Sequence, residues 1–158
     1  MFSNELICNV LDYINQNIFE EIKIDAISKQ FHYDKTYIMK RFKKELGISI
    51  INYSNIIRIY NSLKYFKDNK SILEIALKSG FNSQEYYNEM FKNTLGVSPL
   101  IYKKYIKYIS EINNDDLEII NNKLLEVEMI LNRVNKYKNN RKPKTTVMVK
   151  KLSTYKSI

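Results

Sequence analysis

The sequence predicts an all-α fold, and three observations support this prediction. Only 3 glycines and 2 prolines occur in 158 residues, so the chain offers few positions for sharp turns. Apolar residues recur at intervals of three and four, which is the spacing of amphipathic helices. One series of helix starts and ends occurs twice, which indicates one architecture used twice.

The stretch from Ser71 to Tyr105 contains the clearest series. Ser71 and Glu74 form a capping box, which satisfies the first backbone donors of a helix. Gly80 suits the left-handed residue that ends this helix. The helix is therefore short, and its apolar face consists of Ile72, Ile75 and Ala76.

A longer helix follows after a tight turn. Ser83 is placed to cap it and Gly96 to end it, and Ser98 with Pro99 then begins a third helix. Its inward positions recur every four residues, at Tyr87, Phe91 and Leu95. A short helix, a turn and a longer helix form a helix-turn-helix unit, which can lay its second helix, the recognition helix, in a DNA major groove.

The same series stands 49 positions earlier, with a turn one residue shorter. Asp34 takes the place of Ser83, and Ile38 takes that of Tyr87. The matched residues that follow are Phe42-Lys43, Leu46-Gly47, Ser49 and Tyr53 against Phe91-Lys92, Leu95-Gly96, Ser98 and Tyr102. A first recognition helix is therefore predicted over residues 35–46, with Asp34 as its N-cap.

These residues resemble the signature of a known family. The series Ile75-Ala76, Gly80-Phe81, Phe91-Lys92, Gly96 and Ser98-Pro99 is similar to that of the AraC/XylS family of bacterial transcription regulators. The resemblance covers about residues 5–108. It implies a seven-helix domain whose two recognition helices enter successive major grooves on one face of double-stranded DNA. It favours an activator with RNA polymerase as a candidate partner, although the sequence leaves open whether the protein activates or represses, and no cofactor is expected.

The remaining helices complete this domain. Residues 4–17, 24–31 and 50–67 are predicted to be helical, and the last of these joins the two units. Arg58 in the joining helix matches a position where the family carries arginine, which either contacts phosphate or braces the domain. Two residues depart from the family, Ser28 where alanine is usual and His32 where glycine is common; we interpret His32 as a turn residue.

The first recognition helix carries a basic outward side. We expect this side to contact DNA, through phosphate or base edges, although a lysine-rich side can also simply face solvent. The residues expected to contact DNA are Lys35, Thr36, Met39, Lys40 and Lys43.

The second recognition helix carries a different outward side, formed by Gln84, Glu85, Asn88, Glu89 and Lys92. Glutamine and asparagine can pair with adenine, and glutamate can accept from cytosine N4. A carboxylate near phosphates is otherwise unfavourable. The sequence leaves open whether the glutamates read bases or point to solvent.

Charge and composition limit the other function classes. The net charge of +9 indicates a polyanionic partner. The single cysteine, Cys8, excludes an internal disulfide, and the absence of a leader or a long apolar run predicts a cytoplasmic protein with no membrane segment. With one histidine, no cysteine–histidine cluster and no phosphate-binding glycine loop, the sequence predicts neither an enzyme nor a metal site.

Beyond residue 108 the resemblance ends. A helix over 113–137 has a run of apolar residues with the spacing of a coiled-coil seam, which predicts a homodimer. The alternative is an eighth helix that folds back on its own domain. The seam residues are Leu117, Ile120, Leu124, Val127, Leu131 and Val134.

Charge divides the chain into three segments. Residues 1–108, the predicted DNA-binding domain, are basic; residues 111–137 hold 3 basic and 6 acidic residues; residues 138–158 hold 7 basic and none acidic. The last segment is either the start of a further effector domain, with Val147 and Val149 in a strand, or a basic tail.

A second function class also stays open: a protein-interaction module on a degenerate helix-turn-helix scaffold that modulates another regulator, which it would bind through this tail.

Overall fold

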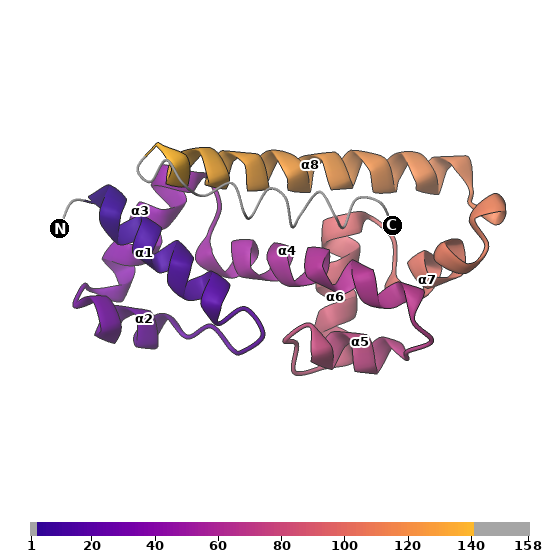
Figure 1. The fold of residues 1–158 in the computed structure, drawn as a ribbon, viewed down its shortest axis with the longest axis horizontal. Coiled ribbons are helices and arrows are strands. Elements are labelled where there is room, and N and C mark those ends of the chain that lie inside the picture. The colour runs from indigo at the N-terminus through magenta and orange to yellow at the C-terminus, as the bar shows by residue number, and fades with distance from the viewer. Residues whose placement is uncertain (1–2, 141–158) are drawn as a thin grey trace.

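Residues 3–140, which the computed structural model describes, form eight α-helices and two short 3-10 helices with no strand (Figure 1). This confirms the all-α prediction. In chain order the elements are α1 (Ser3–Gln16), α2 (Ile24–Phe31), α3 (Lys35–Leu46), α4 (Ile50–Ser62), η1 (Leu63–Lys67), α5 (Ile72–Lys78), α6 (Gln84–Leu95), α7 (Pro99–Lys107), η2 (Ile109–Glu111) and α8 (Asn114–Asn139).

Side-chain caps begin the helices where the sequence predicts them. The Ser71 hydroxyl accepts from the backbone N–H of Glu74 at 3.1 Å, and the Ser83 hydroxyl accepts from Tyr86 at 3.2 Å. Ser98 accepts from the N–H of Ile101 at 3.3 Å. Each cap of this kind stabilises its helix by about 1 kcal/mol. The starts of these three helices are therefore determined locally by the sequence.

The helix that joins the two units is shorter than predicted. α4 ends at Ser62, and the chain continues as the 3-10 helix η1 rather than as one helix to residue 67. The Ser62 hydroxyl donates to the carbonyl of Ile59 at 2.6 Å and lies 2.8 Å from the Tyr87 hydroxyl of α6. A serine hydroxyl that bonds the preceding turn competes with the helical backbone pattern, and the contact with α6 fixes it there.

Each unit contains the same aromatic pair, as the repeat requires. Phe42 packs on Tyr53 with ring centroids 5.9 Å apart, and Phe91 packs on Tyr102 at 5.5 Å. All four rings are buried. Each pair joins a recognition helix to the helix that follows it, so both recognition helices are held from their inward side in the same way.

α8 folds back over both units, as the alternative to a coiled coil requires (Figure 1). It runs antiparallel to α4 and packs on α6 and α3. Of the predicted dimer seam, Ile120, Val127, Leu131 and Val134 are buried within the chain, Leu124 is half-buried and Leu117 is 38% exposed. The prediction that this seam faces a second copy is thus corrected, because most of its apolar surface is already covered. α8 continues to Asn139 and so includes the first two residues of the basic segment predicted from residue 138; the rest of that segment beyond residue 140, with the predicted strand, lies outside the described residues.

Candidate nucleic-acid interface

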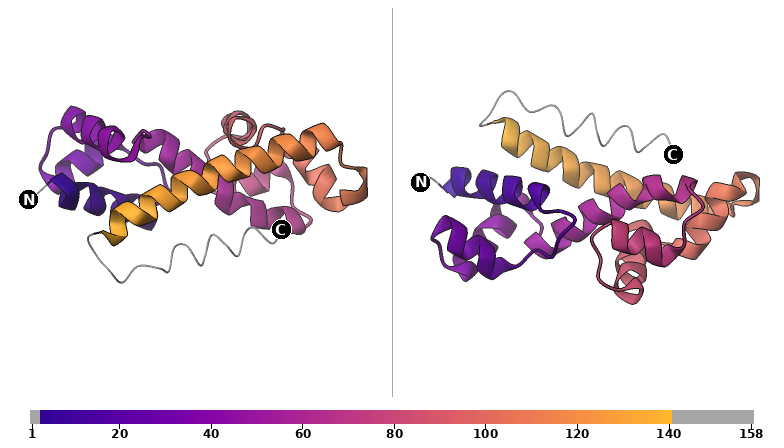
Figure 2. Two further views of the ribbon diagram at one scale, coloured as in Figure 1. Left: turned by 90° about the horizontal axis from the view of Figure 1, so that it is seen from above. Right: turned by 60° about the horizontal axis from the view of Figure 1, so that its bottom comes forward.

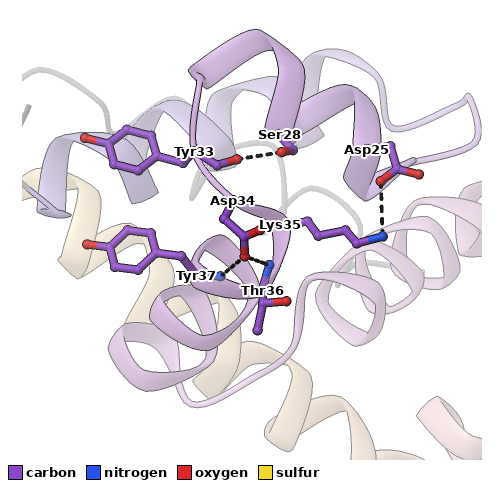
Figure 3. Close-up of polar contacts among 7 residues, drawn as sticks. All are labelled: Asp25, Ser28, Tyr33, Asp34, Lys35, Thr36 and Tyr37. Carbon is purple, nitrogen blue, oxygen red and sulfur yellow. Dashed lines mark hydrogen bonds and ion pairs between the residues drawn. The ribbon is translucent and has the colours of Figure 1, made fainter.

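The turn before the first recognition helix is held by local hydrogen bonds (Figure 3). The Ser28 hydroxyl donates to the Tyr33 carbonyl at 2.5 Å, and Asp34 accepts from the backbone N–H of Thr36 at 2.8 Å and of Tyr37 at 3.3 Å. His32 adopts a left-handed conformation, with φ of 59°. This confirms His32 as a turn residue, and it fixes the angle at which α3 leaves α2.

The outward side of α3 lies where the sequence predicts it. Thr36, Met39, Lys40 and Lys43 are exposed, and neither of these two lysines has an ion-pair partner within residues 3–140. Lys35 is also exposed but lies 3.5 Å from the Asp25 carboxylate of α2 (Figure 3). Lys40 and Lys43, together with the exposed Lys44, therefore present the uncompensated positive charge of this helix.

The outward side of α6 is acidic and amide-bearing. Gln84, Glu85, Glu89 and Lys92 are exposed, and the part of the chain that the structure describes gives neither glutamate a basic partner. Asn88 is half-buried, and its Oδ1 atom has no hydrogen-bond partner among the described residues. The two recognition helices thus share a fold but differ in charge.

Arg58 does not belong to this surface. It is 7% exposed, and its guanidinium donates to the carbonyls of Ile18, at 2.7 Å, and of Glu20. It also lies over the Phe81 ring, 5.9 Å from the ring centroid. Burial lowers the pKa of the guanidinium, and Tyr86 and Glu21 oppose this effect. Of the two roles open from the sequence, the structure supports the brace rather than the phosphate contact.

Sequence reasoning missed the contact that ties α6 to α4. Asn55 of α4 is 4% exposed and donates to the Tyr86 hydroxyl at 2.8 Å. Its Nδ2 atom also lies 3.4 Å from the Met90 sulfur. No periodic signal distinguishes Asn55, because a polar residue on a largely apolar helix usually faces solvent.

The two recognition helices lie on one side of the molecule. Seen from above, α3 and α6 are found along the same edge, with α4 between the units (Figure 2, left). Within residues 3–140 no helix is long and apolar enough to cross a membrane, and no group of side chains is arranged to hold a metal ion. The exposed faces of α3 and α6 are therefore the candidate interface.

Comparison with known proteins places this arrangement in a family. A family model described as a helix-turn-helix domain matches residues 27–105, which is half of the chain. The chain is 31% identical to the TetD protein of transposon Tn10 from Escherichia coli over 104 residues, 65% of this chain and 75% of that protein. The chain belongs to the AraC/XylS family. The matched region is accordingly the DNA-binding helix-turn-helix domain of a transcription regulator.

Other relatives in the AraC/XylS family support the same assignment. The transcriptional activator AarP of Providencia stuartii is 28% identical over 124 residues, 78% of this chain and 88% of that protein. Among solved structures, the C-terminal domain of the response regulator AraT from Geobacillus stearothermophilus aligns with a TM-score of 0.59 and 26% identity, over 63% of this chain and 84% of that one.

Two further matches are more limited. The DNA-binding domain of AdpA in complex with a target DNA aligns with a TM-score of 0.58 over 67% of this chain and 97% of that one, but at 18% identity it supports the fold alone. AdaA of Bacillus subtilis, a bifunctional transcriptional activator and DNA repair enzyme, is 25% identical over 116 residues, and the match covers 55% of that protein. The relatives are mainly transcription regulators.

Proposed function

We propose that this regulator binds specific double-stranded DNA sites by inserting α3 and α6 into successive major grooves. The observation that carries the proposal is the pair of repeat-related helices with exposed polar faces on one side of the molecule (Figure 2). The N-terminal half of a recognition helix is the part that usually reaches base edges. Thr36, Met39 and Lys40 in α3, and Glu85 and Glu89 in α6, lie in or next to that half.

α3 and α6 contribute differently to DNA binding because they differ in charge. Lys40 and Lys43 supply positive charge to phosphate or to guanine, whose O6 and N7 atoms accept from lysine. α6 supplies mainly the amide of Gln84 and the carboxylates of Glu85 and Glu89, which repel phosphate unless they pair with a base. The first unit therefore contributes most of the affinity.

The relatives also suggest the direction of regulation. AarP is described as a transcriptional activator, and an activator that holds a promoter site is positioned to contact RNA polymerase. We propose that this chain acts in the same way, in the cytoplasm where the chromosome is, as a DNA-binding protein without catalytic activity of its own.

The competing function is a protein-interaction module on a degenerate scaffold. In this alternative the scaffold would bind another regulator through the tail that begins at residue 138, most of which lies outside the described residues. The relatives do not favour this function, since they are mainly named as transcription regulators. The intact caps at Ser83, which begins α6, and at Ser98, which begins α7, also give the second unit the local support that Asp34 and Ser49 give the first, which a degenerate unit would not need to keep.

Selection of bound sites from a random duplex library tests the proposal. The intact chain is expected to enrich two half-sites separated by about one helical turn, or 10–10.5 base pairs centre to centre. Retention of all sequences alike, with a steep loss on adding salt, would instead indicate nonspecific binding to phosphates and would contradict the proposal.

A further inference from the structure

We infer that α8 is a strut that sets the distance between the two recognition helices, and thereby the half-site spacing that this regulator accepts. The inference rests on the proposed function. It concerns the helix that lies beyond the family's seven, and its positioning residues are Arg133, Ile119 and Lys138. The argument starts from the points at which α8 touches the two units.

α8 touches the same position in both units. Gly47 ends α3 and Gly96 ends α6, and these glycines are equivalent in the repeat. A Cβ atom at Gly47 would lie 2.6 Å from the Arg133 guanidinium nitrogen Nη1, and a Cβ atom at Gly96 would lie 2.2 Å from the Ile119 Cγ2 atom. The C-terminal ends of both recognition helices thus abut one helix.

The two points of contact lie at a fixed interval along α8. Residues 119 and 133 are separated by 14 positions, which corresponds to about 21 Å of helix rise and nearly four turns. Because the number of turns is almost whole, Ile119 and Arg133 project from nearly the same face. One helix therefore reaches both glycines at once, Gly96 through the branched Ile119 side chain and Gly47 through the longer Arg133 side chain, and so spans the ends of α3 and α6.

Polar contacts fasten both ends of this strut. Near its C-terminal end, the Lys138 ammonium lies 2.6 Å from the Asp12 carboxylate of α1, and the lysine side chain is 13% exposed. The Tyr137 hydroxyl also donates to the Asn4 side chain at 3.2 Å. At the other end, the Tyr105 hydroxyl of α7 donates to the Asp116 carboxylate at 2.5 Å. One end is tied to the first unit, and the other to the second.

α8 is a second connection between the two units, and it restricts how they can move relative to each other. α4 already joins the units, and beside it Arg58 and the turn at Gly80 contact the loop after α1, but none of these contacts holds the C-terminal ends of α3 and α6. α8 runs antiparallel to α4 (Figure 1). A groove of about 310 Å³ lies between them and is lined by residues of α4, α6 and α8. Asn52 and Ile56 of α4 face Val127 and Ile130 of α8 across this groove. The two connections together close a frame in which the recognition helices cannot turn independently.

A protein with both connections intact should bind more weakly to an operator in which the distance between the half-sites is changed. Adding or removing one base pair between half-sites rotates the second major groove by about 35° and shifts it by about 3.4 Å. The rigid protein must then distort itself or the DNA, and either distortion has a free-energy cost. A protein whose strut is loosened can follow the groove, so it should bind the altered and the selected operator with more similar affinity.

The test uses the intact chain with Arg133→Ala and Lys138→Ala combined. The matched control is Asn132→Ala, an exposed neighbour on the same helix. Each protein is titrated with the operator selected by the wild type and with versions lengthened or shortened by one base pair. For the altered operators relative to the selected one, we expect the affinity of the wild type and of the control to fall about tenfold, or by about 1.4 kcal/mol. The affinity of the double variant should fall about threefold or less.

A second measurement needs no DNA. Spin labels on Lys44→Cys and Asn93→Cys report the distance between α3 and α6, while Cys8 is only 3% exposed and remains unlabelled. The double variant should give a broader distance distribution than wild type and control. If circular dichroism shows that the double variant is unfolded, Arg133→Ala alone takes its place.

Three results would overturn the inference. A folded variant that keeps the wild-type spacing preference would reject it and leave the proposed function intact. A relaxed spacing preference without a broader distance distribution would also reject the strut. A wild-type protein that selects no paired half-sites would remove the proposed function, and the inference with it.

Discussion

Arg58 is a single buried guanidinium that joins three segments of the chain. It projects from α4, bonds two carbonyls in the loop after α1 and lies over Phe81 in the turn of the second unit. Replacement by methionine keeps much of the volume but leaves both carbonyls without a donor. Each unsatisfied buried group of this kind costs about 1–3 kcal/mol.

We therefore expect Arg58→Met to lower the free energy of unfolding by about 2–4 kcal/mol in urea denaturation. The free energy of unfolding of Arg58→Lys should lie between those of the wild type and Arg58→Met, because an ammonium lacks the planar fork that reaches two carbonyls at once. A variant with wild-type stability but weaker DNA binding would show that Arg58 contacts phosphate after all.

Glu89 is the residue where the two units differ most, since its equivalent in α3 is Lys40. Its carboxylate is exposed and uncompensated by any ion pair within residues 3–140, so it should repel phosphate. Glu89→Gln should tighten binding to all duplexes by about two- to fivefold at low salt, and the gain should fade as salt screens the charge. Fluorescence anisotropy over a salt series measures both effects. Weaker binding to the selected site alone would instead show that Glu89 accepts from cytosine.

The residues of the candidate interface were largely predictable from the sequence, and the reason is physical. Helical period assigns each position to a side, and Lys40, Lys43, Gln84 and Glu89 are exposed as the period predicts. Arg58 could not be assigned in this way. Its burial depends on carbonyls 38 and 40 residues away in the sequence, which no local pattern reveals.

At the scale of elements, the two glycine caps offer a matched comparison. Gly47 and Gly96 both have positive φ, 71° and 81°, so alanine at either position costs about 1–2 kcal/mol of backbone strain. They differ in what the new Cβ would meet: the flexible end of Arg133 at Gly47, and the branched Ile119 side chain at Gly96.

Gly96→Ala should therefore destabilise the protein more than Gly47→Ala, by about a further 1–3 kcal/mol from overpacking. Adding Ile119→Ala should restore this excess in Gly96→Ala but should do nothing for Gly47→Ala. Chemical denaturation of Gly47→Ala and Gly96→Ala, each with and without Ile119→Ala, measures the coupling of each glycine position to Ile119. Equal losses at the two glycines, unaffected by Ile119→Ala, would show that α8 does not press on α6.

The two recognition helices themselves can be ranked. Lys40→Ala removes an exposed positive charge from α3, whereas Asn88→Ala removes a half-buried amide from α6. We expect the first change to cost about 1–3 kcal/mol in binding if Lys40 reads a base, or to lower the salt slope by about one if it contacts phosphate. The second change should cost less. Equal losses at one salt concentration would contradict a dominant first unit.

Elements whose ends are marked by local chemistry were predictable, and the one element that differs shows why. α3, α5, α6 and α7 begin at side-chain caps that can be read from residue type. The end of α4 at Ser62 depends on a hydroxyl contact with Tyr87, 25 residues later in the chain. The apolar pattern continues through Phe66 regardless, so it could not indicate the change to a 3-10 helix.

On the scale of the whole molecule, the sequence identified the buried stripe of α8 but not what covers it. Periodicity shows that one side of a helix is apolar, and either a second copy of the chain or the chain's own domain can cover that side. The deciding contacts are individual: Ile119 against Gly96, Arg133 against Gly47 and Lys138 with Asp12. Their sequence separations exceed 20 residues, and none belongs to a recurring pattern.

This arrangement leads to a prediction about oligomeric state. Because four of the six seam residues are buried within one chain, the intact protein should sediment as a monomer, and its melting temperature should not change with protein concentration. Leu131→Ala, at a position 3% exposed, should lower the free energy of unfolding by about 2–5 kcal/mol. Met129→Ala, at a position 63% exposed on the same helix, should change it by less than about 0.5 kcal/mol. A coiled-coil dimer would give the opposite result for assembly: a melting temperature that rises with concentration, and a Leu131→Ala variant that dissociates into folded monomers.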